Sequence, residues 1–203
     1  NVMAKELGIP TDSQAALALL TSENAAITAI DMGLMNEIPF MLRVNLGLLA
    51  DMVIQTDRQM KDTFGQLAYG ITTVQTLLEV NPAMYLIEID GEIFEESGVA
   101  LSVTNSGNIG VEGFSILPDI NVSDGLLDVI LMNHSDWLSV VKLAGSTLFQ
   151  TETDVLKRWK GKDIKITLAQ PQNIICDDCV LENIQQLHVK IVPESLRIVI
   201  PTV

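Results

Sequence analysis

The stretch Asp119-Ile-Asn-Val-Ser-Asp124-Gly-Leu-Leu-Asp128-Val-Ile-Leu-Met132 joins an acidic turn to an apolar run. Gly125 allows the chain to reverse direction with a positive φ. Asp124 can cap that turn with its own side chain, or bind a cation together with nearby carbonyl groups. The run from Leu126 to Met132 is typical of a buried strand. Most Asp-Gly pairs are simple turns, so the stretch gains its meaning from the segments around it.

The composition favours one folded domain with a large apolar core. The chain has 203 residues, of which 48% are hydrophobic, and this is enough for a sizeable core. The formal net charge is −14. Binding to a phosphate backbone needs clustered lysine and arginine, so we exclude nucleic acid as a partner. The same charge disfavours electrostatic docking on anionic lipids.

The expected compartment is the cytoplasm. The sequence has no apolar run long enough to span a bilayer and no secretory signal. Two cysteines, Cys176 and Cys179, are too few for a secreted disulfide framework. Because the chain opens on Asn1 within a helical pattern, we expect it to be part of a longer protein.

The sequence pattern predicts an α+β fold that is mainly β. Helices are expected near the N-terminus at 2–7 and 13–20, the second capped by Thr11 or Asp12, and helical periodicity returns at 48–56, 57–78 and 136–148. Strands are expected at 25–32, 38–44, 84–89, 98–103, 114–117, 126–132, 155–159, 163–168, 173–176, 187–192 and 196–200, with a hairpin turn at 35–37. Short strands separated by turns at this spacing are typical of a β-sandwich.

Two short motifs have more than one interpretation. Asp90-Gly91-Glu92 has the composition of a catalytic carboxylate pair, but the strands around it favour a hairpin turn. Cys176-Asp-Asp-Cys179 has the spacing of half a zinc site or of a redox pair. The sequence has no second CxxC, and the residues after Cys179 look extended rather than helical. We therefore favour a strand end in which Asp177 and Asp178 form a turn.

Phosphate-binding signals are sparse. Neither a Walker pattern nor a GxGxxG pattern occurs. Arg58 and Lys61 share a helix face with Asp57, which indicates either a solvated ion pair or a contact with a phosphate or lipid head group.

The order of the motifs resembles the C-terminal domain of the diacylglycerol kinase-like lipid kinases, a family that includes sphingosine and ceramide kinases. Asn1 to Pro10 resembles the segment after the family's nucleotide domain. The family's later motifs resemble Arg58-x-x-Lys61-x-x-x-Gly65-x-Leu67-Ala68-Tyr69, Asp90-Gly91-Glu92, Val103-Thr-Asn105-Ser, Pro118, Asp124-Gly-Leu-Leu-Asp128-Val and Val189 to Pro201. The resemblance covers essentially the whole chain.

This resemblance implies a two-layer antiparallel β-sandwich, the second domain of the diacylglycerol kinase/NAD kinase-like fold. Residues 1–203 would form the substrate-side domain, packed beneath a nucleotide-binding domain that is absent from this chain. The implied activity is the ATP-dependent phosphorylation of a lipid hydroxyl, such as that of diacylglycerol, by a cytoplasmic protein that can lie peripherally on the membrane. ATP would be bound mainly by the missing domain, so this chain alone is expected to be inactive.

The resemblance also implies site residues. A structural Mg²⁺ is expected on the Asp124 side chain and the carbonyls of Asn121 and Leu126, in keeping with the few protein oxygens that Mg²⁺ accepts. Arg58 and Lys61 are expected to bind the substrate or its phosphate.

Two positions depart from the family pattern. The family's Asp-Gly-Glu, whose Glu acts as the base, falls at Asp177-Asp178-Cys179, so Asp177 or Asp178 is the expected catalytic group, with Glu182 as a further substitute. The family's Gly-x-Asp-Ala is Gly47-Leu-Leu-Ala50 here, which makes the lipid side more apolar. The alternative function is therefore a non-catalytic lipid-binding or regulatory relative. Exposed sandwich edges also allow a homodimer.

Overall fold

The computed structural model describes residues 2–51, 54, 81–107, 119–133 and 156–202. Two short helices, α1 (Val2–Glu6) and α2 (Ser13–Leu19), precede the strands. Asp12 caps α2, since its carboxylate accepts a hydrogen bond from the backbone N–H of Ala15 at 2.9 Å. In the described part of the chain, none of the helices has the length and hydropathy needed to cross a bilayer.

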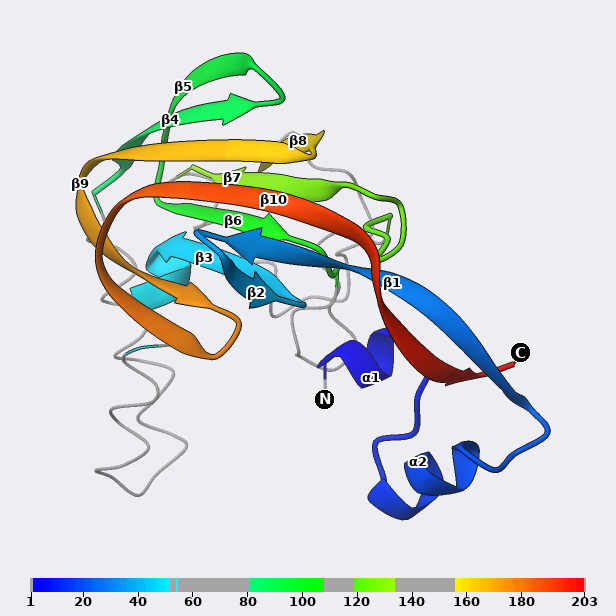
Figure 1. Cartoon of the computed structure of the whole chain (residues 1–203). Helices are drawn as coiled ribbons and strands as arrows, with labels where there is room; N and C mark the ends of the chain where they lie inside the picture. Colours follow the sequence, from blue (N-terminus) through cyan, green and yellow to red (C-terminus); the bar gives the residue numbers. More distant parts are fainter. Residues whose placement is uncertain (1, 52–53, 55–80, 108–118, 134–155, 203) are drawn as a thin grey trace, which may run out of the picture.

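Ten strands form one antiparallel sheet that folds back over itself (Figure 1). Their bounds are β1 (Ala25–Met35), β2 (Ile38–Phe40), β3 (Arg43–Gly47), β4 (Ala83–Ile89), β5 (Glu92–Gly98), β6 (Ala100–Thr104), β7 (Leu127–Met132), β8 (Leu156–Gly161), β9 (Asp163–Cys176) and β10 (Cys179–Pro201). The main strand order is β2-β1-β10-β9-β3-β6-β7-β8, and the hairpin β4–β5 joins through β9. The predicted mainly β, sandwich-like fold is confirmed.

The two long strands β9 and β10 connect the two layers. The first half of β9 pairs with β4, and its last residues pair with β3. β10 pairs with β9 along its first half and with β1 along its second, so that Ala25 lies opposite Pro201. The outer ends of β1 and β10 form a two-stranded arm beyond the sandwich (Figure 1).

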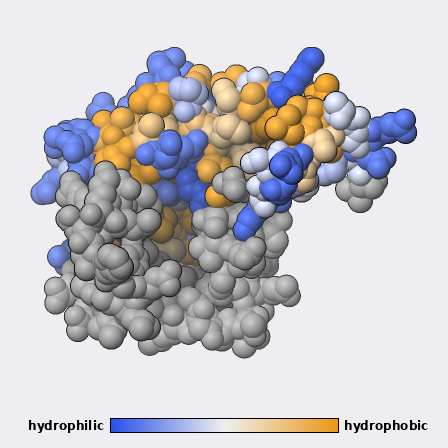
Figure 2. Space-filling view, turned by 90° about the horizontal axis from the view of Figure 1, so that it is seen from below, coloured by the Kyte–Doolittle hydropathy of each residue, from blue (hydrophilic) through white to orange (hydrophobic). Residues whose placement is uncertain are grey.

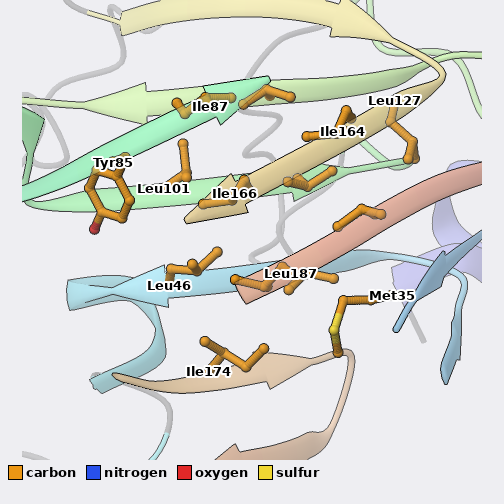
Figure 3. Packing of buried hydrophobic residues seen from close by; sticks show 14 of the residues in the cluster. Met35, Leu46, Tyr85, Ile87, Leu101, Leu127, Ile164, Ile166, Ile174 and Leu187 are labelled. Carbon is orange, nitrogen blue, oxygen red and sulfur yellow. The ribbon is translucent and has the colours of Figure 1, made fainter. Parts of the chain in front are cut away.

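The core lies between the layers and consists almost entirely of aliphatic side chains. Alternate residues of β4 and β9, such as Ile87, Ile164 and Ile166, face Leu46 and Leu101 from β3 and β6, and all five are fully buried (Figure 3). This alternation is what a strand with one buried face requires. β7 departs from it, because all six of its residues are buried, including the carboxylate of Asp128 in an otherwise apolar run.

A pair of contacts closes the sandwich where the edge strands β5 and β8 meet. The rings of Phe94 and Trp159 lie 5.4 Å apart between centroids, within the range of a favourable aromatic pair. Beside them, the Lys157 ammonium lies 2.6 Å from the Glu96 carboxylate. The seam thus combines an apolar contact on the inside with an ion pair nearer the solvent.

Several predicted boundaries were wrong. The expected strands 163–168 and 173–176 are one strand, β9, and 187–192 and 196–200 both lie in β10. Register shifts in the β9–β10 pairing keep these strands continuous while they bend, and sequence alternation alone does not reveal such shifts. The expected strand 38–44 is divided into β2 and β3. The segments predicted at 57–78, 114–117 and 136–148 lie outside the described residues.

Truncation of Ile166, which is fully buried, should cost roughly 2–5 kcal/mol of unfolding free energy, because Ile→Ala in a packed core leaves a cavity. Ile93→Ala is the matched control, since Ile93 is 64% exposed and surface changes usually stay within about 0.5 kcal/mol. Urea denaturation of both variants measures the difference. Similar midpoints for the two would contradict the assignment of the core face.

Candidate functional site

The loop that leads into β7 is organised by its own side chains. Asn121 accepts a hydrogen bond from the Ser123 backbone N–H at 3.0 Å, and Asp124 accepts one from the Leu126 N–H at 3.1 Å. Gly125 has φ +71°, so the predicted reversal after Asp124 is present. These are the side-chain turns that Asn and Asp favour.

A buried carboxylate, Asp31, supports this loop from below. Asp31 is 1% exposed, and its two oxygens accept hydrogen bonds from the backbone N–H groups of Gly125 at 2.7 Å and Glu194 at 2.8 Å. Its own N–H donates to the Val122 carbonyl at 2.8 Å, where β1 has a register shift between Ile30 and Met32. Sequence reasoning missed Asp31, although an acidic residue inside an apolar strand was a usable signal.

Two cations on β8 hold the acidic residues of the loop and of β7. Arg158 donates from Nε to Asp128 at 2.6 Å and from Nη1 to Asp119 at 2.7 Å. Lys160 lies 3.2 Å from the Asp124 carboxylate and 4.0 Å from that of Asp128. Neither cation was predicted as a site residue, because strand pairing rather than sequence spacing brings them to the loop.

Burial and charge act in opposite directions on these carboxyl groups. Burial raises the pKa of Asp128, and the hydrogen bond from Arg158 opposes that rise. On the exposed Asp119, the hydrogen bond from the same guanidinium lowers the pKa. The same guanidinium thus acts to lower the pKa of both carboxyl groups, and burial outweighs it only at Asp128.

The oxygen atoms of the loop are suitable ligands for the predicted Mg²⁺. A carboxylate can accept about four hydrogen bonds or ligand contacts, and each oxygen of Asp124 accepts one bond, from the Leu126 N–H or from Lys160. Lone pairs therefore remain for a hard cation, with the carbonyls of Asn121 and Leu126 as the further predicted ligands. The Lys160 ammonium would compete with that cation for the same carboxylate. Magnesium at this loop stays a prediction.

The turn between β9 and β10 assigns different roles to the two predicted catalytic residues. The carboxylate of Asp177 accepts hydrogen bonds from the backbone N–H groups of residues 41, 42 and 43 at 2.8, 2.9 and 2.9 Å. Asp177 thus anchors the connection between β2 and β3. Asp178 is exposed and is the more accessible carboxylate for a proton transfer. A catalytic role for either residue stays a prediction.

Asn105 links the two places. Its backbone N–H donates to the Leu42 carbonyl at 2.9 Å, and its side-chain amide donates to the carbonyls of Met41 at 3.3 Å and Asp31 at 3.0 Å. A continuous polar path therefore runs from Asp177 through residues 41–43 and Asn105 to Asp31 and the loop. The sequence marked Asn105 as a landmark without indicating this role.

The structure places the remaining candidate residues in different settings. Asp90 braces the β8–β9 turn through hydrogen bonds from the N–H groups of Lys162 and Asp163 at 3.0 and 2.9 Å, so the hairpin interpretation of Asp90-Gly91-Glu92 is confirmed. Within the described ranges, three or more His, Cys, Asp and Glu side chains nowhere gather as a metal site, and the zinc interpretation of Cys176 and Cys179 stays untested. Arg58 and Lys61 lie outside the described residues.

An open groove of about 650 Å³ runs beside the loop. Its walls come from Glu6 and Leu7 at the end of α1, Thr28 and Ile200 in the arm, and residues 119–123. Glu6 also accepts hydrogen bonds from the Ser106 hydroxyl and from the Gly107 N–H at 3.2 Å, which fixes α1 against the end of β6. The groove combines carboxylate and aliphatic walls.

Comparison with known proteins identifies relatives of the whole chain. The family model described as the YegS C-terminal NAD kinase beta sandwich-like domain matches residues 43–200. An uncharacterized protein of Synechocystis is 30% identical over 99% of this chain and 47% of its own length. A diacylglycerol kinase of Bacillus subtilis is 28% identical over 73% of this chain and 48% of its own. A probable YegS-like lipid kinase of Pseudomonas putida is 32% identical over 65% and 43%.

The fold is also found in solved structures. The crystal structure of a diacylglycerol kinase from Bacillus anthracis superposes with a TM-score of 0.70 at 18% identity, over 97% of this chain and 62% of that one. The chain spans about half the length of the curated relatives it matches.

Replacing Asp31 by Asn should destabilise the chain by about 1–3 kcal/mol. One of the two backbone N–H groups would then face the NH₂ group of the new amide and would lose its hydrogen-bond acceptor. Asp178→Asn is the control, since it makes the same chemical change on an exposed turn. Thermal or urea unfolding compares the two. If the Asp31 variant is as stable as the Asp178 variant, the loop does not depend on the buried carboxylate.

Mg²⁺ should raise the melting temperature of this chain, measured against NaCl of equal ionic strength. Asp124→Ala should abolish the rise, because it removes the carboxylate ligand of the predicted site. Lys160→Met should enlarge the rise, because the competing ammonium is gone. Asp119→Ala in the same loop serves as the control. An identical melting temperature with and without Mg²⁺, in both the unchanged chain and Lys160→Met, would refute a cation site here.

Proposed function

This chain belongs to the family of the YegS C-terminal NAD kinase beta sandwich-like domain, and we propose that it is the substrate-side domain of an ATP-dependent lipid kinase. The observation that carries the proposal is the family match over residues 43–200, together with relatives named diacylglycerol kinase and lipid kinase. The proposed reaction transfers the γ-phosphoryl group of ATP to a lipid hydroxyl, such as that of diacylglycerol.

The proposed division of labour leaves the nucleotide to a separate domain. ATP, with the Mg²⁺ on its phosphates, would supply the phosphoryl group and offset the charge that develops during transfer. This chain's residues would position the lipid and accept its hydroxyl proton. Asp178 is the best-placed proton acceptor, because it is exposed while Asp177 is engaged by three backbone N–H groups.

The groove beside the loop is a proposed contact surface for the lipid outside the reacting hydroxyl, because Asp178 is not among its walls. Its polar walls include Asp119 and Asn121, and Ile200 and Leu7 provide apolar contact. Exposed hydrophobic side chains lie on α2, the arm and the β4–β5 hairpin, namely Leu17, Leu20, Ile27, Met84, Leu86 and Ile93. Apolar surface is also visible on the face seen from below (Figure 2). These features support a peripheral position on the cytoplasmic side of a membrane, with an apolar rather than an electrostatic contact.

A homodimer remains part of the proposal, but two sheet edges are poorly suited to it. β2 contains Pro39, which lacks a donor for strand pairing. β5 carries Glu92, Glu95 and Glu96, and like charges on an edge strand oppose pairing with a second copy. A dimer would therefore use a surface other than these edges. The acidic chain also supports the proposal that nucleic acid is not a partner.

A non-catalytic lipid-binding or regulatory role is the second candidate. It is favoured by the position where the resembled family carries its Glu, which is Cys179 or Val180 here depending on the placement of one gap, and by the structural use of Asp177. Binding without phosphorylation would follow if Asp178 cannot replace that base.

Phosphorylation assays on the full-length gene product, with a panel of lipid hydroxyls and labelled ATP, distinguish the two candidates. We expect turnover by the full-length protein and none by the 203-residue chain. Asp178→Asn should lower kcat by on the order of 100-fold, the usual contribution of a general base, whereas Glu182→Gln on the neighbouring strand should not. Turnover by the isolated chain, or an unchanged kcat for Asp178→Asn, would contradict this assignment. Lipid binding with no turnover for any lipid would favour the second candidate.

A further inference from the structure

The two cysteines lie opposite each other at the closed end of the β9–β10 hairpin. Cys176 ends β9, Cys179 begins β10, and the two are partners in the antiparallel register. Both are free thiols, with Cys176 buried and Cys179 exposed. Opposite residues of an antiparallel pair project from the same face of the sheet, with Cβ atoms about 4.5–5.5 Å apart. The fold thus brings together the two cysteines of the chain.

This arrangement is close to the geometry of a disulfide. Opposite residues in an antiparallel pair have Cα atoms about 4.5–5.5 Å apart, and disulfides span Cα separations of about 4.4–6.8 Å. In a disulfide the two Cβ atoms lie about 3.5–4.5 Å apart. The Cβ atoms of Cys176 and Cys179 must therefore approach each other by roughly 1 Å for the bond to form. A bond closed in this way carries some strain, and strained or exposed disulfides are the ones that are readily reduced.

We propose that Cys176 and Cys179 form a reversible dithiol–disulfide pair, oxidised by low-molecular-weight disulfides such as oxidised glutathione. The inference concerns the thiols alone and holds whether or not the chain serves a kinase. A metal is the weaker alternative, because the described residues provide no third His, Cys, Asp or Glu that completes a site with them.

The reaction has a defined order. Burial raises the pKa of Cys176 to about 12, and the charge of Asp177 adds to that rise, so Cys176 stays a thiol. The exposed Cys179 loses its proton to solvent and attacks one sulfur of the oxidant, which breaks the oxidant's S–S bond and releases one thiolate. Cys176 then gives up its proton to solvent and attacks Cys179 Sγ, which forms the protein disulfide, breaks the mixed disulfide and releases the second thiolate. The two released thiolates take up the two protons. The two protein thiols are oxidised, and one oxidant molecule is reduced to two thiols.

The modification would act on the polar path described above. Asp177, which has φ 52°, lies between the cysteines and holds the backbone of residues 41–43. Drawing Cys176 and Cys179 together changes the turn that sets the direction of this carboxylate. Oxidation therefore alters the anchoring of the β2–β3 connection and, at the same turn, the position of Asp178.

Intact-mass spectrometry and thiol counting test the proposal. The reduced, monomeric chain is incubated with oxidised glutathione. The expected product has lost two hydrogens, has no free thiol, and returns to the reduced mass with dithiothreitol. A stable glutathione adduct, two remaining free thiols, or a disulfide found only between two molecules would overturn it.

Single serine variants test the order of attack. Cys176→Ser should stop at a persistent glutathione adduct on Cys179, because the resolving thiol is gone. Cys179→Ser should stay unmodified, because Cys176 is buried. Melting curves establish that both variants are folded before the reaction is compared. If Cys179→Ser is modified as fast as Cys176→Ser, the assignment of Cys179 as the attacking thiol is wrong.

Discussion

A carboxylate that is buried in a folded core needs hydrogen bonds that compensate its charge. Asp31 is such a carboxylate, and the elements around it must supply those bonds. Its side chain and backbone bind to four residues in three segments that are distant in the sequence: Val122 and Gly125, Glu194, and Asn105. The loop before β7, the bend of β10 and the end of β6 are therefore fixed by one residue. Asp177 does the same for the β2–β3 connection, and Asn105 joins the two carboxylates into one arrangement.

Acidic residues in this chain thus fall into two kinds. Asp31 and Asp177 use their oxygens to hold backbone N–H groups, and Asp128, within the buried strand β7, is held by Arg158. Asp124 and Asp178 lie on turns, where solvent and ligands can reach them. A strongly acidic composition therefore does not by itself indicate catalytic or metal-binding residues, because some of the acidic side chains stabilise the fold. The proposed catalytic and metal-binding roles fall on the accessible kind.

Sequence reasoning succeeded where the signal was local. The hairpin turns at 35–37 and 90–92, the cap of α2 and the turn at Asp124-Gly125 depend on a few adjacent residues, and all are present. It failed where strands bend or pair at long range, as in β9 and β10, because register shifts leave no local mark. Asp31, Arg158 and Lys160 were missed for that reason, since their partners lie tens of residues away. The resemblance to a family supplied the sandwich and the placement of motifs, but not these contacts.

The pairing of β1 with β10 also governs how the domain is made. Ala25 lies opposite Pro201, so the first strand of the sheet obtains its long partner only after residues 26–200 have been synthesised. Until then β1 exposes an unpaired apolar edge, and the polymer must close a very large loop before the pairing contributes stability. Folding of this domain should therefore be slow and depend on the late synthesis of β10, and a chain that lacks β10 would be the form most prone to aggregate.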